Sequence, residues 1–339
     1  MAKEKNVTIL EIARMAGVNP STVSRVLNHP EVVSEETRDR VLGLIQEYNY
    51  KPNPFARGLQ TRKSRIVALV VPNFTNLSFA NLARGVQERL QSHDYSMVIF
   101  SSHESSDWEK KICREISNLH IDGVIFASSS SHMPHHEELS EDTAKLFIER
   151  DGSSVGIDSL LLDMEGAFGK LIHHLSGHGH SRIALVAGDT GSYSGMEKIR
   201  CFRKAMDQAG HSVPEGRIAN ALWSSREGWS AAEDLLSQAE PPTAIISATD
   251  SIALGIIGAA ASLGFRIPED ISIASFNDEP GSESMNPPLT TMGYDDYGMG
   301  QDAAGIILNR IRHPDAEMVQ SLYPMHLVER KTTGALKPK

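Results

Sequence analysis

Two nearly identical stretches, SRIVALV at residues 64–70 and SRIALV at residues 181–186, begin two similar halves of this chain. Each is a short run of Ile, Val, Leu and Ala, the composition of a strand buried on both faces of a sheet, and each precedes a helical pattern. Strand-type and helix-type segments go on alternating after both stretches. Because this alternation is typical of parallel sheets covered by helices, the repeat predicts two α/β lobes, each built on a doubly wound parallel sheet.

The main elements of both lobes can be placed from their patterns. In the first lobe, strands are expected at 65–72, 96–102 and 122–128, with helices at 79–93 and 108–119. In the second lobe, strands are expected at 181–186, 243–248 and 271–276, with a helix at 250–265. Such sheets bind ligands beyond the carboxyl ends of their strands. The two lobes should therefore share a ligand-binding cleft.

The first fifty residues instead predict three short helices. Thr8 opens a capping-box signature, and the helix that it starts should end near Gly17. Asn19 and Pro20 are residue types favoured at the N-cap and the first position of a second helix. A third helix should begin after Ser34, and its apolar side chains are expected in the core: Val41, Leu42, Leu44 and Ile45.

The second of these helices has an apolar face and a polar face. Val23, Val26 and Leu27 share the apolar face, and Ser21, Thr22, Ser24 and Arg25 lie on the other, near the positive end of the helix dipole. Two short helices joined by a glycine turn and braced by a third form a helix-turn-helix, whose second helix enters the major groove of DNA. The alternative is a plain three-helix bundle with a solvated polar face.

The charge is unevenly distributed along the chain. Residues 1–65 carry 11 Lys and Arg against 7 Asp and Glu, the remaining residues carry 22 against 36, and the whole chain has a net charge of −10. An acidic body repels polyanions. Contact with nucleic acid should therefore be confined to the basic head, where Lys and Arg can displace counterions from phosphates.

Residues 51–65 join the head to the first lobe and include five basic residues and no acidic one. Asn53 and Pro54 repeat the helix-start signal that precedes the second helix, so a helix of one or two turns is expected through Ala56 and Leu59. So short a helix is marginal in water and should form only against a partner. The basic charge indicates that this partner is DNA.

Several other classes of protein have signatures that this sequence does not contain. Neither a membrane span nor export is expected, because no apolar run is long enough and the N-terminus has no apolar signal segment. Cys113 and Cys201 are expected to be reduced thiols of a cytoplasmic protein. Motifs of phosphate-binding loops, zinc proteases and serine hydrolases do not occur, so no enzyme activity, catalytic residue or cofactor is predicted. No metal site is predicted at the clustered histidines, which have no cysteine or carboxylate at ligand spacing: His132, His135, His136, His173, His174, His178 and His180.

The head and the linker carry the most specific motifs. VTILEIARMAGVNPSTVSRVLN, VSEETRDRV and YKPNPFARGLQ, together with the two-lobed body, resemble the LacI/GalR family of bacterial transcriptional repressors over essentially the whole chain. The resemblance implies a cytoplasmic homodimer whose recognition helices read two halves of a pseudo-palindromic operator, while paired hinge helices enter the minor groove. It also implies a periplasmic-binding-protein-like body in which the chain crosses between lobes near residues 160, 290 and 320.

These correspondences define the expected domains. A helix-turn-helix domain should span residues 1–50, a hinge helix and linker 51–65, and the effector-binding and dimerisation body 66–339. One lobe of the body should consist of residues 66–160 and 293–320, and the other of residues 161–292 and 321–330.

The resemblance also implies which residues contact DNA. Pro20 and Ser21 occupy the main base-reading positions, Arg25 the position of an arginine contact shared in the family, and Leu59 that of a leucine wedged into the central base step. Pro20 has no side-chain donor, so base discrimination should depend on Ser21, Arg25 and apolar contact from the proline ring. Further DNA contacts are expected from Thr8, Asn19, Thr22, Ser24, Asn28, Asn53 and Ala56.

By the same correspondence, a small-molecule effector between the lobes should contact Asn73, Phe79, Glu149, Lys198, Trp223, Thr249, Asp250 and Asn277. Amides and carboxylates hydrogen-bond to hydroxyls, and an indole can stack on the apolar side of a sugar ring. Structural alternatives exist for some of these residues: Trp223 and Phe79 could belong to the core, and Asp250 could cap the helix that it begins.

Two of these positions differ from the common family pattern. Lys198 stands where many sugar-responsive members have arginine, and Asn277 where they have aspartate. Lysine does not offer the bidentate fork of arginine, and asparagine removes an anion while adding a donor. A neutral sugar and a phosphorylated or acidic sugar are therefore both expected ligand classes. The alternative function is an exported or cytosolic sugar-binding protein without a regulatory role, which would share the body but would not need the DNA-binding head.

Overall fold

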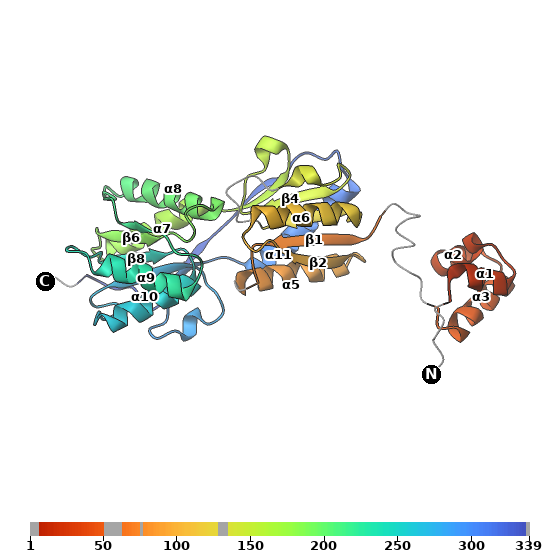
Figure 1. Cartoon of the computed structure of the whole chain (residues 1–339), viewed down its shortest axis with the longest axis horizontal. Coiled ribbons are helices and arrows are strands. Elements are labelled where there is room, and N and C mark those ends of the chain that lie inside the picture. The colour runs from red at the N-terminus through yellow and green to blue at the C-terminus, as the bar shows by residue number, and fades with distance from the viewer. Residues whose placement is uncertain (1–6, 51–62, 75–76, 128–134, 337–339) are drawn as a thin grey trace. The chain divides into compact units, whose positions relative to one another are not determined.

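A computed structural model of the chain describes residues 7–50, 63–74, 77–127 and 135–336 (Figure 1). The chain separates into two compact units, Met1–Ser64 and Arg65–Lys339. The first unit is helical, and the second contains two six-stranded sheets with helices on both faces. The predicted fold class, a helix-turn-helix head and a body of two parallel α/β lobes, is confirmed.

The head consists of α1 (Ile9–Ala16), α2 (Pro20–Asn28) and α3 (Glu35–Glu47), with the short 3-10 helix η1 (Pro30–Val32) before α3. The capping box at the start of α1 is present: Thr8 Oγ1 accepts from the amide of Glu11, and the Glu11 carboxylate accepts from the amide of Thr8 at 2.8 Å. Gly17 ends α1 in the left-handed conformation (φ 66°), which glycine adopts without strain. Asn19 and Ser34 occupy the N-cap positions of α2 and α3, as predicted, but neither side chain makes a capping hydrogen bond.

The core of the head is formed by one face of each helix. Ile12, Val23 and Val41 are completely buried, and Leu44 and Ile45 pack against them. Leu42, which was expected in this core, is 42% exposed. Successive residues of a helix point about 100° apart, so with Val41 directed inward its neighbour lies on the outer side.

The first lobe of the body contains a parallel sheet in the order β11-β5-β4-β3-β1-β2. Its strands are β1 (Ile66–Val71), β2 (Ser96–Ser101), β3 (Gly123–Phe126), β4 (Ala144–Ile148), β5 (Asp158–Leu162) and β11 (Gln320–Tyr323). Its helices are α5 (Leu77–Gln91), α6 (Ser106–Asn118) and α11 (Asp296–Arg312), with 3-10 turns η2 (His136–Glu138) and η3 (Ser153–Val155). Helices α5 and α11 pack together on one face of the sheet, and α6 covers the other.

The second lobe repeats this arrangement with the order β12-β10-β9-β8-β6-β7. Its strands are β6 (Ile183–Val186), β7 (Ile218–Ala219), β8 (Ala244–Ser247), β9 (Ser272–Asn277), β10 (Thr290–Gly293) and β12 (His326–Val328), of which β12 is antiparallel to β10. Its helices are α7 (Met164–Gly177), α8 (Tyr193–Gln208), α9 (Ser225–Leu236) and α10 (Asp250–Ser262), with the 3-10 turn η4 (Ser282–Ser284). Helix α7 packs with α8, and α9 packs with α10.

The sequence repeat corresponds to equivalent strands of the two sheets. Strands β1 and β6 both lie second from the edge, next to β2 and β7 respectively. In β1, Val67 and Leu69 face the cluster beneath α5 and α11, whereas Ala68 and Val70 face the cluster beneath α6. Because both faces of the strand are covered, the whole run must be apolar.

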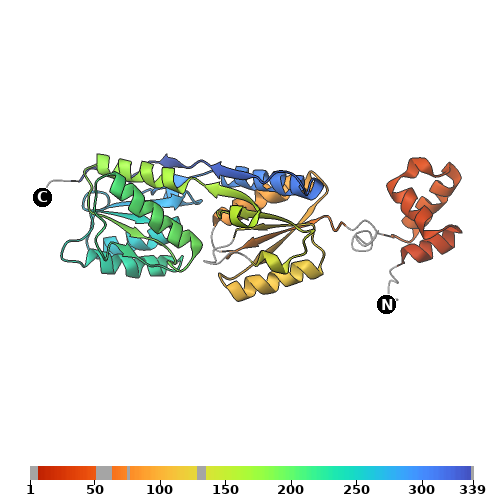
Figure 2. The same ribbon diagram turned by 90° about the horizontal axis from the view of Figure 1, so that it is seen from above.

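The chain passes between the lobes three times (Figure 2). It leaves the first sheet after β5 ends at Leu162, returns after β10 ends at Gly293, and leaves again after β11 ends at Tyr323. These positions lie slightly beyond the expected limits at residues 160, 292 and 320. Strand β11 pairs with β5 as far as Tyr323 and Leu162, and β10 pairs with β9 as far as Gly293.

Candidate functional site

Helix α2 of the head presents one buried and one accessible face. Val23 and Val26 are 0% and 2% exposed and belong to the core of the head. The predicted DNA-contacting residues lie on the other face: Pro20, Ser21 and Arg25 are exposed, and Thr22 and Ser24 are half-buried. Polar side chains are thus accessible on the N-terminal half of α2, whose opposite face packs in the core of the head.

The remaining predicted DNA contacts differ in what they can offer. Thr8 is exposed, but its hydroxyl already takes part in the capping box with Glu11. Asn19 is exposed and makes no capping bond, so its amide is available to a partner. Asn28 is the last residue of α2. Asn53, Ala56 and Leu59 lie outside the residues that the structure describes.

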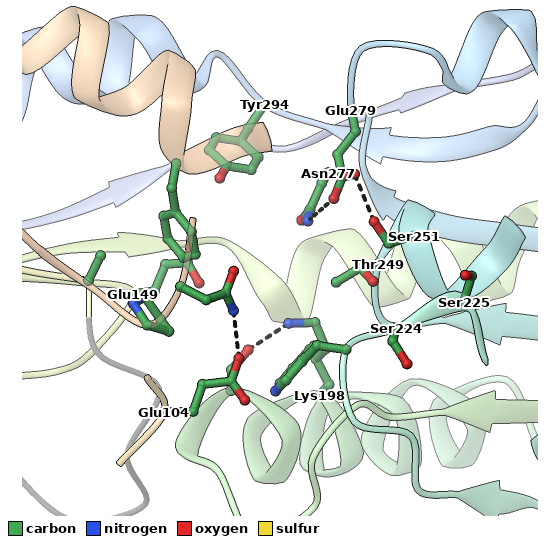
Figure 3. A pocket seen from close by; sticks show the side chains of 16 residues that line it. Glu104, Glu149, Lys198, Ser224, Ser225, Thr249, Ser251, Asn277, Glu279 and Tyr294 are labelled. Atoms are coloured by element: carbon green, nitrogen blue, oxygen red, sulfur yellow. Dashed lines mark hydrogen bonds between the residues drawn. The ribbon is translucent and has the colours of Figure 1, made fainter. Parts of the chain in front are cut away.

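A cavity of about 330 Å³ lies between the two lobes of the body (Figure 3). This volume falls within the range of small-molecule sites. Of the eight residues predicted to contact an effector, seven line it: Asn73, Phe79, Glu149, Lys198, Trp223, Thr249 and Asn277. Asp250 does not line it. Residues scattered over two hundred positions of sequence are therefore brought together around one space.

The topology of the two sheets explains this convergence. The cavity is lined at the ends of parallel strands, by Asn73 beyond β1, Glu149 beyond β4, Thr249 beyond β8 and Asn277 at the end of β9. Because the carboxyl ends of parallel strands meet at one edge, both lobes direct polar loops to the same place. The first turns of α8, α9 and α10 complete the wall of the second lobe, with the hydroxyls of Ser194, Ser225 and Ser251.

Several lining residues have left-handed backbone conformations although they are not glycine. The φ angles are 57° at Glu104, 58° at Glu149, 47° at Trp223 and 106° at Asn277. Such conformations cost about 1–3 kcal/mol each and persist where the surrounding structure holds them, often at ligand sites. These backbone conformations therefore place the four residues in the cavity lining, and they reduce the stability of the fold.

Lys198 and Glu149 line the cavity from different lobes and carry opposite charges. Lys198 is 4% exposed, and its ammonium donates to Ser194 Oγ at 2.7 Å. Burial lowers the pKa of Lys198, and the negative charge of Glu149 opposes this shift. Burial raises the pKa of Glu149, and the positive charge of Lys198 opposes it in turn. Each group stabilises the charged form of the other, although the two come from different lobes.

Trp223 forms part of the same wall. The Lys198 ammonium lies 5.7 Å from the centre of its ring, within the range of a cation–π contact. The indole also packs against the core beneath α9 and α10. Trp223 is therefore both a lining residue of the cavity and part of the edge of the core. Phe79 likewise lines the cavity while packing on the core of the first lobe.

Asp250 lies behind the cavity wall and not on it. Its side chain is completely buried and accepts hydrogen bonds from the Glu279 amide (2.7 Å), Ser282 Oγ (2.6 Å) and Thr291 Oγ1 (3.0 Å). The residue that caps α10 is Thr249, which accepts from the amide of Ile252, so the capping alternative for Asp250 is wrong. The carboxylate of Asp250 instead holds the loop after β9 in place.

The structure adds polar lining residues that sequence reasoning missed: Glu104, Ser194, Ser224, Ser225, Ser251, Glu279 and Tyr294. Three of them contact predicted residues: Glu104 accepts from Asn73 at 2.5 Å, Ser194 Oγ accepts from Lys198 at 2.7 Å, and Glu279 accepts from Asn277 at 3.4 Å. The position of two of these residues after a strand is a signal that the sequence contains: Glu104 follows β2, and Tyr294 follows β10. The sequence pattern did not predict β10.

Two further findings concern the described part of the chain. Within it, no group of three or more His, Cys, Asp or Glu side chains is arranged to hold a metal ion. Of the helices described, none has both the length and the apolar character needed to cross a membrane.

Comparison with known proteins follows the same division into head and body. Residues 8–53 match the description of bacterial regulatory proteins of the lacI family, and residues 172–333 match that of the periplasmic binding protein-like domain. Catabolite control protein A of Priestia megaterium is 32% identical over 304 residues, which cover 89% of this chain and 92% of that protein. The lac repressor dimer bound to operator and the anti-inducer ONPF superimposes with a TM-score of 0.88 at 26% identity, covering 98% of this chain and 100% of the other. The complex of the transcriptional regulator CelR with cellobiose has a TM-score of 0.73 at 27% identity, covering 96% and 99%.

The three-helix head, the two-lobed body and these similarities agree over nearly the whole length of the chain. The chain belongs to the LacI family of bacterial regulatory proteins, and it is a DNA-binding transcriptional regulator with an effector-binding domain, not an enzyme.

Proposed function

We propose that this regulator is a repressor whose affinity for operator DNA is controlled by a sugar or sugar phosphate bound in the cavity between the lobes. One observation carries the proposal: both lobes contribute amide, hydroxyl and carboxylate groups to a cavity that also contains the indole of Trp223. A sugar ring needs both many hydrogen-bond partners and an apolar surface. The similarity to a regulator solved with cellobiose supports this ligand class.

In this proposal, DNA is read by a homodimer in the cytoplasm. One short helix with few donors supplies little discrimination, and a twofold pair on a pseudo-palindrome doubles it. Ser21 and Arg25 contact base edges, while Thr22, Ser24 and neighbouring polar groups contact phosphates. The similarity to the lac repressor dimer bound to operator supports the dimeric arrangement.

The effector acts through the geometry of the lobes. The pair of Glu149 and Lys198 spans the two lobes, so a ligand inserted beside it favours one lobe arrangement over another. That arrangement sets whether the two hinge segments of a dimer, within residues 51–65 and including Leu59, can meet on DNA. A differential affinity of about 1–3 kcal/mol for one arrangement is sufficient to shift operator occupancy.

A titration of operator DNA tests the proposal. Binding sites are selected from genomic fragments with the full-length protein, and affinity is measured by fluorescence anisotropy with and without mono- and disaccharides and their phosphates. At least one compound should change operator affinity by about tenfold or more. Trp223→Ala should abolish this response while retaining operator binding without effector, whereas Trp108→Ala, which alters an exposed tryptophan on α6, should retain both.

Two results would contradict the proposal. A sugar that binds the protein but leaves operator affinity unchanged would show that the cavity does not control DNA binding. An unaltered response of the Trp223→Ala variant at the same ligand concentration would place the effector elsewhere.

A further inference from the structure

The cavity between the lobes has an excess of negative charge. Three carboxylates line it, those of Glu104, Glu149 and Glu279, whereas Lys198 is the one cationic side chain among the lining residues that the structure describes. Lys198 and Glu149 influence each other directly, as their opposed pKa shifts show. Glu104 and Glu279 are therefore left without a compensating cation.

Glu279 is the more buried of these two residues. It is 9% exposed, and the donors to its carboxylate among the described residues are neutral: Ser251 Oγ at 3.2 Å and Asn277 Nδ2 at 3.4 Å. In Figure 3 these three side chains lie together on one wall, well separated from Lys198. Within the described part of the chain, no ion pair is formed by Glu279.

The surroundings of Glu279 add negative charge to this wall. Its own amide donates to the buried carboxylate of Asp250, which brings a second acid behind it. The neighbouring Asp278, in contrast, is paired with Arg330 at 2.7 Å. Burial and the charge of Asp250 raise the pKa of Glu279, and both causes would be offset by a cation placed in the cavity.

Tyr294, which follows β10 and lines the cavity, is buried near several of the same carboxylates. Burial raises the pKa of its hydroxyl well above the usual value, and the charges of Glu149, Asp296 and Glu279 raise it further. A tyrosine in such a field remains protonated and can donate a hydrogen bond. It offers no positive charge to an anion.

We propose that the cavity binds an unphosphorylated amino sugar, whose protonated amine pairs with Glu279 and whose hydroxyls meet the serine, threonine and amide groups of the wall. This inference rests on the proposed function, in which the cavity holds a sugar-like effector. A phosphorylated sugar would bring a dianion to a cavity with three carboxylates and one ammonium, and that ammonium is already engaged. A ligand ammonium would instead receive a charge-assisted hydrogen bond from a preformed acceptor.

Isothermal titration calorimetry with matched ligands tests this proposal on the full-length protein. The panel contains glucosamine and galactosamine, the parent hexoses, the uncharged N-acetyl derivatives and the hexose 6-phosphates. The amine should bind about tenfold or more tightly than its parent hexose and its N-acetyl derivative, because each of these has no charge-assisted bond to Glu279. The phosphates should bind most weakly.

A pair of isosteric variants locates the effect. Glu279→Gln keeps the shape of the side chain and an acceptor for Ser251, so it should lose the preference for the amine over the parent hexose. Glu233→Gln removes the same charge from an exposed position of α9 and should leave every affinity unchanged. The thermal unfolding midpoint of each variant shows whether it is folded.

The wild-type protein supplies a second readout that needs no variant. Because the pKa of Glu279 is raised, the carboxylate is more fully ionised at pH about 7 than at pH about 5, so amine affinity should increase with pH over this interval. The affinity for the parent hexose should not increase.

The possible results distinguish failure of the amino-sugar proposal from failure of the proposed function. Equal affinity for amine and parent hexose, or tighter binding of a phosphate, overturns the amino-sugar proposal and leaves the proposed function standing. Binding of none of the sugars, amines or phosphates overturns both.

Discussion

The six-membered ring of Trp223 lies directly against Gly188, in the loop that follows β6, so that no side chain fits at position 188. A Cβ placed there would collide with Cζ3 and Cη2 of the indole. The backbone of Gly188 is also left-handed, with φ at 78°. The position of one wall of the cavity therefore depends on a residue that does not itself line it.

Gly188→Ala should displace the indole and reduce effector affinity as strongly as Trp223→Ala does, while operator binding without effector is retained. A suitable control is Gly210→Ala, because Gly210 has a similar φ of 74° but open space around its α-carbon. Both variants should be destabilised by about 1–2 kcal/mol from backbone strain. Calorimetric titration with the effector separates them, and an equal loss of affinity in the control would attribute the effect to strain alone.

Arg25→Ala should weaken operator binding by about 1–3 kcal/mol, the contribution of a good base contact in the major groove. Arg25 is exposed on α2 and takes no part in the core of the head, so the protein should remain folded. Anisotropy titration measures the change, with Arg226→Ala on the surface of α9 as the control that removes the same charge from the body. Unchanged operator affinity would contradict the assignment of α2 as the reading helix.

The hinge segment provides a prediction that concerns its stability. A helix of one or two turns through Leu59 is too short to be stable alone, so the amides of residues 54–60 should exchange rapidly in the free protein and become protected on operator DNA. Leu59→Ala should bind the operator more weakly without any change in effector affinity measured in the absence of DNA. Hydrogen exchange followed by mass spectrometry makes both comparisons, and strong protection in the free protein would show that the hinge is preformed.

Asp158→Ala should destabilise the body by about 3 kcal/mol, because the partly buried Arg310 guanidinium loses the buried carboxylate with which it is paired. The Asp158 side chain is 1% exposed, and it accepts from Arg310 Nε and Nη2 at 2.9 and 2.8 Å, which joins α11 to β5. Urea unfolding measures the loss. The exposed pair of Arg266 and Asp270 is the matched comparison, since Asp270→Ala should cost about 1 kcal/mol or less.

His180 predicts how stability depends on pH. Burial lowers its pKa below 6.5, although the hydrogen bond to the Gly334 carbonyl (3.0 Å) opposes this shift. The unfolded chain therefore binds the proton more readily than the folded one. The contribution of neutral His180 to the free energy of unfolding is thus fully present at pH above about 6.5, and it is lost as the pH falls through the pKa of the folded state. Urea unfolding between pH about 8 and about 5 should show the loss, and His180→Gln should flatten the slope, whereas His313→Gln, which changes an exposed histidine, should not.

The local features of this protein follow largely from its sequence, because they depend on neighbouring residues. The capping box at Thr8, the stop at Gly17 and the start at Pro20 depend on contacts within a few positions, and the structure has these boundaries. The equivalent strands β1 and β6 of the two sheets were predicted from their apolar runs, since a strand covered on both faces must be apolar throughout. Leu42 shows the limit, because an apolar residue can lie on the outer side of an amphipathic helix.

Only the tertiary structure decided which polar residues face the cavity and which lie behind it. Asp250 and Glu279 are 29 positions apart in sequence, yet in the turn after β9 the amide of Glu279 donates to the carboxylate of Asp250. Of these two side chains, Glu279 lines the cavity and Asp250 does not. The tertiary structure also brings together other residues that no local pattern relates: Glu149 and Lys198 line one cavity, Trp223 lies against Gly188, and α11 returns to pack on α5 of the first lobe. Hydrophobic periodicity specifies which side of a helix or strand is buried, whereas the charge and shape of a ligand site depend on how loops from two separate sheets meet, and that arrangement is set by the packing of the lobes.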